Sequence, residues 1–200
     1  MISTIKRLSS RSLESFYVLK EGLRYGHQNL HQNQSFNDAR DHQLSYRDRC
    51  IGVELHWTRF SLISIQFLYT NHHSLKKSSA RSGSGYSSSF MLDSEEKIEK
   101  INLYEKSSEG NSRIVGIEFR TNNGRKSEVF GSNDGHFLTE SFEFYTFAYA
   151  KGIQSNEIGI ESLQFVWIKS APATEQISTG KFSSRTSSNF NSNFSTSFYG

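Results

Sequence analysis

The chain has 200 residues, of which 34% are hydrophobic and 22% are charged, and its formal net charge is +3. Its longest apolar stretch, residues 60–69, is interrupted by Ser61, Ser64 and Gln66 and falls short of the roughly 20 apolar residues that a membrane span needs. The single cysteine, Cys50, excludes an internal disulfide, and no Cys/His cluster has the spacing of a structural zinc site. We therefore expect a protein without a membrane span, metal or other cofactor, held together by packing.

The positive charge belongs to the two flanks of the chain. Residues 1–50 contain 8 Lys and Arg against 5 Asp and Glu, residues 51–168 contain 12 against 14, and residues 169–200 contain 3 against 1. A nucleic-acid-binding domain gathers basic residues on its folded surface, so this distribution argues against such a partner. The basic start has the composition of a weak mitochondrial presequence and lacks the apolar core of a secretory signal, and we interpret it as a disordered basic segment. The sequence leaves the compartment open, with a cytoplasmic location as the default.

Secondary structure is predicted in the middle of the chain. Residues 1–45 are polar and predict mostly disorder, with a loop or disordered segment over 24–42. From residue 51 onward, short segments rich in β-branched and aromatic residues alternate with polar turns, as in an all-β sandwich, barrel or prism. We predict strands over 51–57, 62–70, 87–92, 98–104, 113–120, 126–130, 142–148 and 159–168.

Two local patterns support this prediction. Alternation over 113–120 predicts that Val115, Ile117 and Phe119 face the core while Ile114 faces away. The segment Asn122-Asn123-Gly124 predicts a hairpin turn of the Asn-Gly kind. The end of the chain, residues 170–200, reads as a disordered low-complexity tail rich in Ser, Asn and Phe.

Five motifs, in order, resemble those of the jacalin-related lectins, including the animal zymogen-granule-type members. They are the strand S-I-Q-F-L-Y (64–69), the Gly-rich loop 83–86 with F-M-L-D-S-E-E-K-I (90–98), the hairpin I-E-F-R-T-N-N-G-R (117–125), the turn from Phe130-Gly131 to Gly135, and the closing segment I-G-I-E-S-L-Q-F (158–165).

This resemblance implies a β-prism I fold, with three four-stranded Greek-key sheets around a pseudo-threefold axis and sugar-binding loops at one end. It places the domain over residues 46–169. The first strands of the prism are then missing from the assigned segments, so residues 1–45 are either mostly disordered or partly complete the prism. Segments 13–23 and 43–46 are the candidates to supply those strands.

The resemblance also implies a principal sugar site in the loop before the last strand, normally G-x-x-x-D, together with an N-terminal Gly-Gly loop. Glu161 stands at the Asp position and Glu157 at the Gly position, while Gly22 and Gly26 are the nearest substitutes for the Gly pair. Because both positions differ, we expect weak or altered glycan specificity. The candidate binding residues of this loop are Gly152, Asn156, Glu157, Ile158, Gly159 and Glu161.

A second candidate loop covers residues 81–88. It contains Gly83, Gly85 and Tyr86 and follows Lys76, Lys77 and Arg81, cations that suit an anionic glycan. The alternative is a solvated turn, the usual state of charged surface loops.

A few other residues suggest functions for which the sequence gives weaker support. Adjacent His72 and His73 point to opposite faces of a strand, which favours a surface turn over a metal site. Cys50 is more simply a partly buried thiol than a nucleophile. Asp93, Glu95 and Glu96 resemble exposed turn charges rather than an acid–base pair, and Trp57 and Trp167 fit core or prism-edge positions.

We therefore interpret the sequence as a non-enzymatic, lectin-like module whose partners are glycans or glycoconjugates. Useful avidity would require multivalency, through a homo-oligomer or through the Phe-spaced tail. The competing interpretation is a protein-interaction or structural module that keeps the prism and has lost sugar binding.

Overall fold

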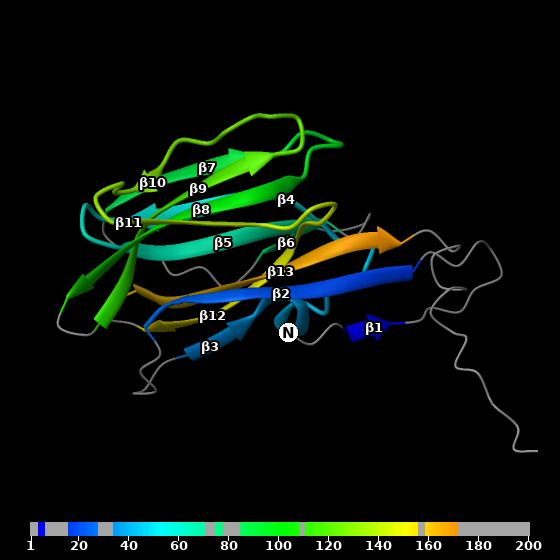
Figure 1. Ribbon diagram of the computed structural model, residues 1–200, viewed down its shortest axis with the longest axis horizontal. Helices are drawn as coiled ribbons and strands as arrows, with labels where there is room; N and C mark the ends of the chain where they lie inside the picture. The colour runs from blue at the N-terminus through cyan, green and yellow to red at the C-terminus, as the bar shows by residue number, and fades with distance from the viewer. Residues whose placement is uncertain are drawn as a thin grey trace, which may run out of the picture.

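The computed structural model describes residues 4–6, 16–27, 34–70, 75–77, 85–108, 111–155 and 159–171, whose regular secondary structure is strand except for one short helix (Figure 1). Among these residues no helix has the length and apolar character needed to cross a membrane. The elements are β1 Thr4–Lys6, β2 Phe16–Gly26, β3 Gln34–Asn37, α1 Asp38–Asp41, β4 Arg49–Trp57, β5 Leu62–Thr70, β6 Leu75–Lys77, β7 Tyr86–Met91, β8 Ile98–Ser108, β9 Asn111–Thr121, β10 Phe130–Gly131, β11 His136–Ser141, β12 Thr146–Ser155 and β13 Gly159–Ala171.

The described strands form three antiparallel sheets. Sheet B has the order β6-β5-β4-β7 and sheet C the order β10-β9-β8-β11. In both, three consecutive strands pair as neighbours and the fourth returns beside the first, which is a Greek key. Sheet A has the order β1-β2-β13-β12-β3, so its central hairpin comes from the end of the described chain and its flanking strands from the beginning. The predicted β-prism fold is confirmed.

The prediction of loop or disorder over residues 24–42 is wrong where the structure describes this segment. Strand β2 continues to Gly26 and pairs with β13, while β3 pairs with β12 and leads directly into α1. Most β2 side chains are exposed or half-buried, and Tyr25 is the buried one. A strand with so few inward apolar residues carries no clear alternation, so its place in the sheet depends on partners distant in sequence.

Two further strand predictions differ from the structure. The segment predicted as a strand over 126–130 forms one isolated bridge, Arg120 to Lys126, and the short β10. The predicted strand over 142–148 combines a turn with the start of β12, and the preceding β11 was missed because only one of its residues, Glu140, is buried. A turn lies at the predicted Asn-Gly position, where Gly124 has φ +79° and its N–H donates to the Thr121 carbonyl. Asn123 does not have a positive φ, so the turn is not of the type that Asn-Gly favours in two-residue hairpins.

Aromatic rings from all three sheets meet in the core. Phe67 of sheet B lies 6.1 Å from Phe119 of sheet C and 4.5 Å from Phe147 of sheet A, measured between ring centroids. Trp167 is fully buried and packs edge-on against Phe147. Rings at such distances and tilts add to the stabilisation from burial itself, so this cluster joins the sheets around the prism axis.

A buried carboxylate joins sheet C to sheet A. Glu140 of β11 is 4% exposed and accepts three hydrogen bonds. They come from the Leu23 backbone N–H at 2.8 Å, the Tyr25 hydroxyl at 2.7 Å and the Trp167 indole N–H at 2.5 Å. A Cβ on Gly22 would lie 1.9 Å from the same carboxylate. Glu140 therefore sets the position of β2, and Gly22 serves this contact.

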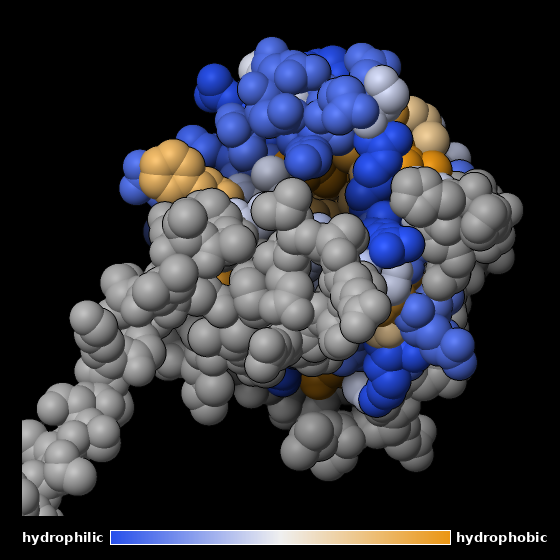
Figure 2. Space-filling view, turned by 90° about the vertical axis from the view of Figure 1, so that its right-hand side faces the viewer, coloured by the Kyte–Doolittle hydropathy of each residue, from blue (hydrophilic) through white to orange (hydrophobic). Residues whose placement is uncertain are grey.

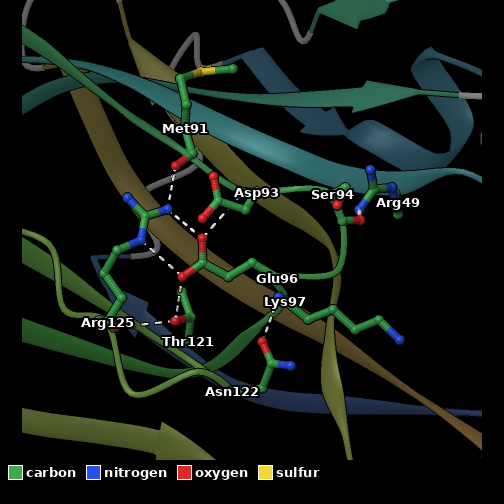
Figure 3. A network of polar contacts seen from close by, with 9 residues as sticks. All are labelled: Arg49, Met91, Asp93, Ser94, Glu96, Lys97, Thr121, Asn122 and Arg125. Atoms are coloured by element: carbon green, nitrogen blue, oxygen red, sulfur yellow. Dashed lines mark hydrogen bonds and ion pairs between the residues drawn. The ribbon is translucent and has the colours of Figure 1, made fainter.

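A second buried carboxylate, Glu96, lies at the end of the prism where β7, β8 and β9 meet (Figure 3). It is 1% exposed, binds the Arg125 guanidinium and accepts a hydrogen bond from the Thr121 hydroxyl at 2.6 Å. The Arg125 guanidinium also lies 4.3 Å from the centre of the Phe90 ring. The prediction that Glu96 is an exposed turn charge is therefore wrong, although Asp93 and Glu95 are exposed.

The Glu96–Arg125 contact makes the free energy of unfolding decrease at acidic pH. Hydrogen bonding from Arg125 is the largest of several effects that lower the pKa of Glu96 to about 2 from 4.5. The stabilisation is therefore present above pH 4.5 and is lost as the pH falls toward 2. We expect Glu96→Gln to reduce the free energy of unfolding by about 1–2 kcal/mol at pH 7, discounted because Arg125 is partly exposed. Urea unfolding between pH 2 and 7 measures this, and a loss unchanged at pH 2 would contradict the assignment.

A third buried carboxyl, Asp38 of α1, lies at the junction of sheets A and B. It is 2% exposed, accepts a hydrogen bond from the Tyr69 hydroxyl at 2.6 Å and is also bound by the Ala150 backbone. Burial is the largest effect on the carboxyl and raises its pKa to about 7. Nearby Cys50 is also buried, which raises the pKa of its thiol to about 12 and argues against a nucleophilic role.

The pH dependence from Asp38 has the opposite sign to that from Glu96. A raised pKa means that the folded state keeps the proton, so wild-type stability falls as the pH rises from about 4 to 7. Asn at position 38 does not ionise, so the stability of Asp38→Asn relative to wild type should rise by about 2–4 kcal/mol across this window. Paired thermal and urea unfolding at pH 4 and pH 8 measures the difference, and a constant difference would refute it.

Candidate functional site

Sheets B, C and A each have a central hairpin, formed by β4 and β5, by β8 and β9, and by β12 and β13, and the adjoining ends of the paired strands lie at one end of the prism, at the left of Figure 1. Two close contacts join the three sheets at this end. A Cβ on Gly159, at the start of β13, would lie 2.7 Å from the Ile63 Cα in β5. The Gly26 N–H, at the end of β2, donates to Glu105 Oε1 of β8 at 2.6 Å. Sheets A, B and C therefore meet at this end of the prism.

Each central hairpin has a β-bulge at an equivalent position. In each hairpin one residue of the second strand has no partner in the first strand. These bulge residues are Ile63 in β5, Val115 in β9 and Glu161 in β13. The bulge at Val115 also corrects the predicted alternation of β9, because Ile114 joins the core together with Ile117 and Phe119.

The bulges coincide with an internal repeat in the sequence. Residues 63–67 read I-S-I-Q-F, residues 115–119 read V-G-I-E-F and residues 161–165 read E-S-L-Q-F. The last residue of each copy is a core phenylalanine. Bulges re-aim side chains and concentrate near functional sites, and among these three described bulges only Glu161 carries a carboxylate.

Sheets A and C each contain the same kind of backbone contact, which we call the Gly-X clip. It is formed by Gly26-His27 in sheet A and by Gly131-Ser132 in sheet C. The His27 N–H donates to the Glu161 carbonyl at 2.8 Å, and the Ser132 N–H donates to the Val115 carbonyl at 2.8 Å. Gly26 has φ +81° and Gly131 has φ +104°. A Cβ on either would lie 2.1 or 2.2 Å from the same carbonyl oxygen, so the clip requires glycine.

The structure brings three candidates of the predicted principal site to the β12–β13 hairpin. Glu161 is 7% exposed and occupies the bulge, and Gly159 has φ +92° at the start of β13. Gly152 lies inside β12, where a Cβ would meet the Ser162 carbonyl and the Phe36 ring, so it serves packing of β3 on β12. The other three candidates, Asn156, Glu157 and Ile158, lie outside the described residues.

The second predicted loop ends at the same end of the molecule. Gly85 has φ +150° and a Cβ there would lie 2.3 Å from the Trp57 carbonyl oxygen. Tyr86 is 67% exposed and stacks on Trp57 with ring centroids 6.3 Å apart. Gly83 and Arg81 lie outside the described residues, as do His72 and His73, and for Lys76 and Lys77 the structure describes only the backbone in β6.

Sequence reasoning missed one residue of this end, His27, and the specific role of Gly26. The sequence points to Gly26 only as a substitute for a missing Gly pair, and it predicts His27 to lie in a loop or disordered segment. The internal repeat could have identified the three bulges, since its copies are visible in the sequence. The pairing of β2 with β13, which brings His27 beside Glu161, has no comparable local signal.

The sequence profile of the Jacalin-like lectin domain matches residues 35–160, which is more than half of the chain. The chain belongs to the jacalin-like lectin family. Comparison with curated protein sequences finds no match.

Solved structures of jacalin-related lectins share the fold at low sequence identity. A mannose-binding jacalin-related lectin from Ananas comosus is 13% identical, with a TM-score of 0.60 over 76% of this chain and 99% of its own. A mannose-specific jacalin-related lectin from Morus nigra, solved in complex with mannose, is 14% identical, with a TM-score of 0.61 over 81% of this chain and 99% of its own. Frutapin from Artocarpus incisa is 15% identical, with a TM-score of 0.61 over 74% and 95%.

The Gly-X clip of sheet A can be tested by comparing two glycines with nearly equal φ. Gly124 has φ +79° and has no atom within 4 Å of a built Cβ among the described residues, whereas Gly26 faces the Glu161 carbonyl. We expect Gly124→Ala to cost about 1 kcal/mol of unfolding free energy from backbone strain alone. Gly26→Ala should cost about 3 kcal/mol or more because crowding is added. Urea unfolding measures both, and equal losses would show that the clip is not tight.

Proposed function

We propose that this jacalin-like lectin domain binds carbohydrate, without catalysis, at the end of the prism formed by Glu161, the Gly26-His27 clip and the Tyr86 surface. The observation that carries the proposal is the position of Glu161. Of the three equivalent bulges among the described strands, only this one has a carboxylate, and it is also the one beside the β2 clip.

The chemistry of this end suits a sugar. A carboxylate accepts hydrogen bonds from vicinal hydroxyls, and an exposed ring such as that of Tyr86 offers a flat apolar surface. Each hydrogen bond contributes little net free energy because water competes for the same groups. The affinity for a single monosaccharide is therefore low, and multivalent display would raise it. Because two of the solved relatives are described as mannose-binding and mannose-specific, mannose-type glycans are the first ligands to test.

Two features support an altered specificity. Glutamate extends the carboxylate one methylene further than the aspartate that the family resemblance expects at position 161. The Gly26 N–H, a backbone donor at this end, is already bound to Glu105. Hydroxyl contacts at this site are therefore arranged differently from those implied by the family pattern.

A glycan array followed by calorimetric titration tests the proposal. We expect wild type to bind a mannose-type or other glycan, and Glu161→Gln to weaken binding about tenfold or more, since hydrogen bonds to charged groups contribute about 1.5–3 kcal/mol. Tyr86→Ala should weaken binding less. The matched control is Phe144→Ala, which removes an aromatic residue 75% exposed in the β11–β12 turn at the opposite end of the prism.

The competing function, a protein-interaction module without sugar binding, predicts a different result. Wild type would then bind no glycan on the array, and Glu161→Gln would change nothing. Protein partners would be recovered equally well with and without free sugar in the buffer. That combination would leave the fold and family intact and remove the lectin function.

A further inference from the structure

The sequence contains one Asn-Gly pair, Asn123-Gly124, in the turn that follows β9. Both residues are exposed. The Asn123 side chain forms no hydrogen bond with another described residue. No described atom lies within 4 Å of a Cβ built on Gly124. The side-chain amide is therefore free to turn, and nothing crowds the backbone that follows it.

The neighbouring Asn122 is held by two hydrogen bonds. Its N–H donates to the Lys97 carbonyl at 3.0 Å, and its Oδ1 accepts from the Lys97 N–H at 2.8 Å (Figure 3). An amide fixed in this way is not free to turn toward the backbone of the next residue, which here carries a side chain. The structure therefore distinguishes Asn123 from Asn122.

A second residue followed by glycine provides an internal comparison in the same sheet. Asp134 precedes Gly135 in the connection between β10 and β11. A hydrogen bond from the Lys106 Nζ, at 2.8 Å, lowers the pKa of Asp134 and keeps its carboxyl ionised. A Cβ on Gly135 would lie 2.7 Å from the Glu105 carbonyl oxygen. An ionised carboxylate resists a nucleophile and the backbone beside it is packed, so this pair lacks both features of Asn123-Gly124.

These two features permit a reaction that needs only water. The Gly124 backbone nitrogen, after losing its proton to solvent, attacks the side-chain carbonyl carbon of Asn123, and glycine favours this close approach because it has no Cβ. A C–N bond forms and closes a succinimide ring, while the C–N bond to the side-chain amide breaks and ammonia leaves with a proton from solvent. Water then opens the ring at either carbonyl, which gives aspartate or isoaspartate. One water is consumed and one ammonia released.

One hydrogen bond opposes the attack. The Gly124 N–H donates to the Thr121 carbonyl at 2.9 Å and must leave it before the nitrogen can react. A hydrogen bond between neutral groups contributes little net free energy, so this one slows the reaction about tenfold at most relative to the unfolded chain. The turn therefore delays the reaction without preventing it.

The same turn positions Arg125. The Thr121 N–H donates to the Arg125 carbonyl at 2.9 Å, and the Arg125 guanidinium binds Glu96 and the Met91 carbonyl (Figure 3). Isoaspartate adds a methylene to the main chain two residues before Arg125. A longer backbone inside so short a turn disturbs the register of these contacts.

We propose that Asn123 is a modification site whose side chain deamidates spontaneously through attack by the Gly124 nitrogen, and that the isoaspartate product loosens the contact of Arg125 with Glu96. The modification adds a negative charge and lengthens the backbone at the end of the prism away from Glu161. The stability of this end declines with the age of the protein. This inference is independent of carbohydrate binding.

The first test is mass spectrometry of tryptic peptide 121–125 from full-length protein incubated at pH 7 and pH 8. Fragmentation should locate a gain of about 1 Da on Asn123, with Asn122 and peptide 127–151 unchanged. The rate should rise about tenfold between the two pH values, as the deprotonated fraction of the nitrogen does, and should stay within about tenfold of the rate in urea. Asn123→Gln should give no product, and Gly124→Ala should react about tenfold more slowly or less.

Two results would refute the site. They are equal conversion of Asn122 and Asn123, and a native rate more than about tenfold below the rate in urea.

The second test measures the consequence for stability. Ion exchange separates the deamidated protein by its added charge, and chromatography of peptide 121–125 gives its isoaspartate content. We expect the urea midpoint of this form to fall by no more than Glu96→Gln lowers it, because both act through one contact. Asn123→Asp, which adds the charge without the methylene, should unfold as wild type does. In a Glu96→Gln background the loss on deamidation should be smaller. An equal loss in both backgrounds, or an unchanged midpoint, would refute the effect on Arg125.

Discussion

The hydrogen bonds of the Glu140 carboxylate hold the first long strand of the chain in the prism. Strand β2 has few inward apolar residues, so burial alone defines its position weakly. Glu140 supplies the missing specificity from sheet C through the Leu23 N–H, the Tyr25 hydroxyl and the Trp167 indole. Removing one partner of such a buried network costs more than the bond contributes, because the others remain buried without it. The end of β2, including the clip on Glu161, follows directly after this anchor and is also held by pairing with β13.

The pseudo-threefold fold contains three similar hairpins, one in each sheet, and a few side chains distinguish one hairpin from the other two. The backbone repeats the same bulge in each sheet at Ile63, Val115 and Glu161. Geometry is therefore common to the three positions, while chemistry differs: two of these described bulges carry aliphatic side chains and one carries a carboxylate. The same holds for the Gly-X clip, whose backbone hydrogen bond is repeated in sheets A and C with His27 and Ser132 at equivalent positions. The hairpin of the candidate site therefore differs from its two counterparts in side chains, while the backbone is similar in all three.

The buried carboxylates away from this end serve the structure in different ways. Glu96 is paired with a cation and keeps its charge, because Arg125 lowers its pKa. Asp38 accepts a hydrogen bond from the Tyr69 hydroxyl. Burial of the Asp38 carboxyl raises its pKa toward neutrality. The motifs that carry the family resemblance thus have a physical explanation. In these motifs, Glu96 accepts hydrogen bonds from Thr121 and Arg125. These bonds link the β7–β8 connection to the β9–β10 connection (Figure 3).

By itself, the sequence determined the elements whose signals are local: the alternating strands from residue 51 onward, the Asn-Gly turn, and the motifs that indicate the family and the hairpin bearing Glu161. It indicated β2 only through the candidate segment 13–23 and did not determine β3 or β11. Strands with one inward apolar residue have no periodic pattern and gain stability only from partners far along the chain. For the same reason, only the tertiary structure decided that Glu96 is buried, that Gly152 serves packing, and that His27 lies beside Glu161. Those positions follow from contacts between residues more than twenty apart in sequence, which local sequence preferences do not encode.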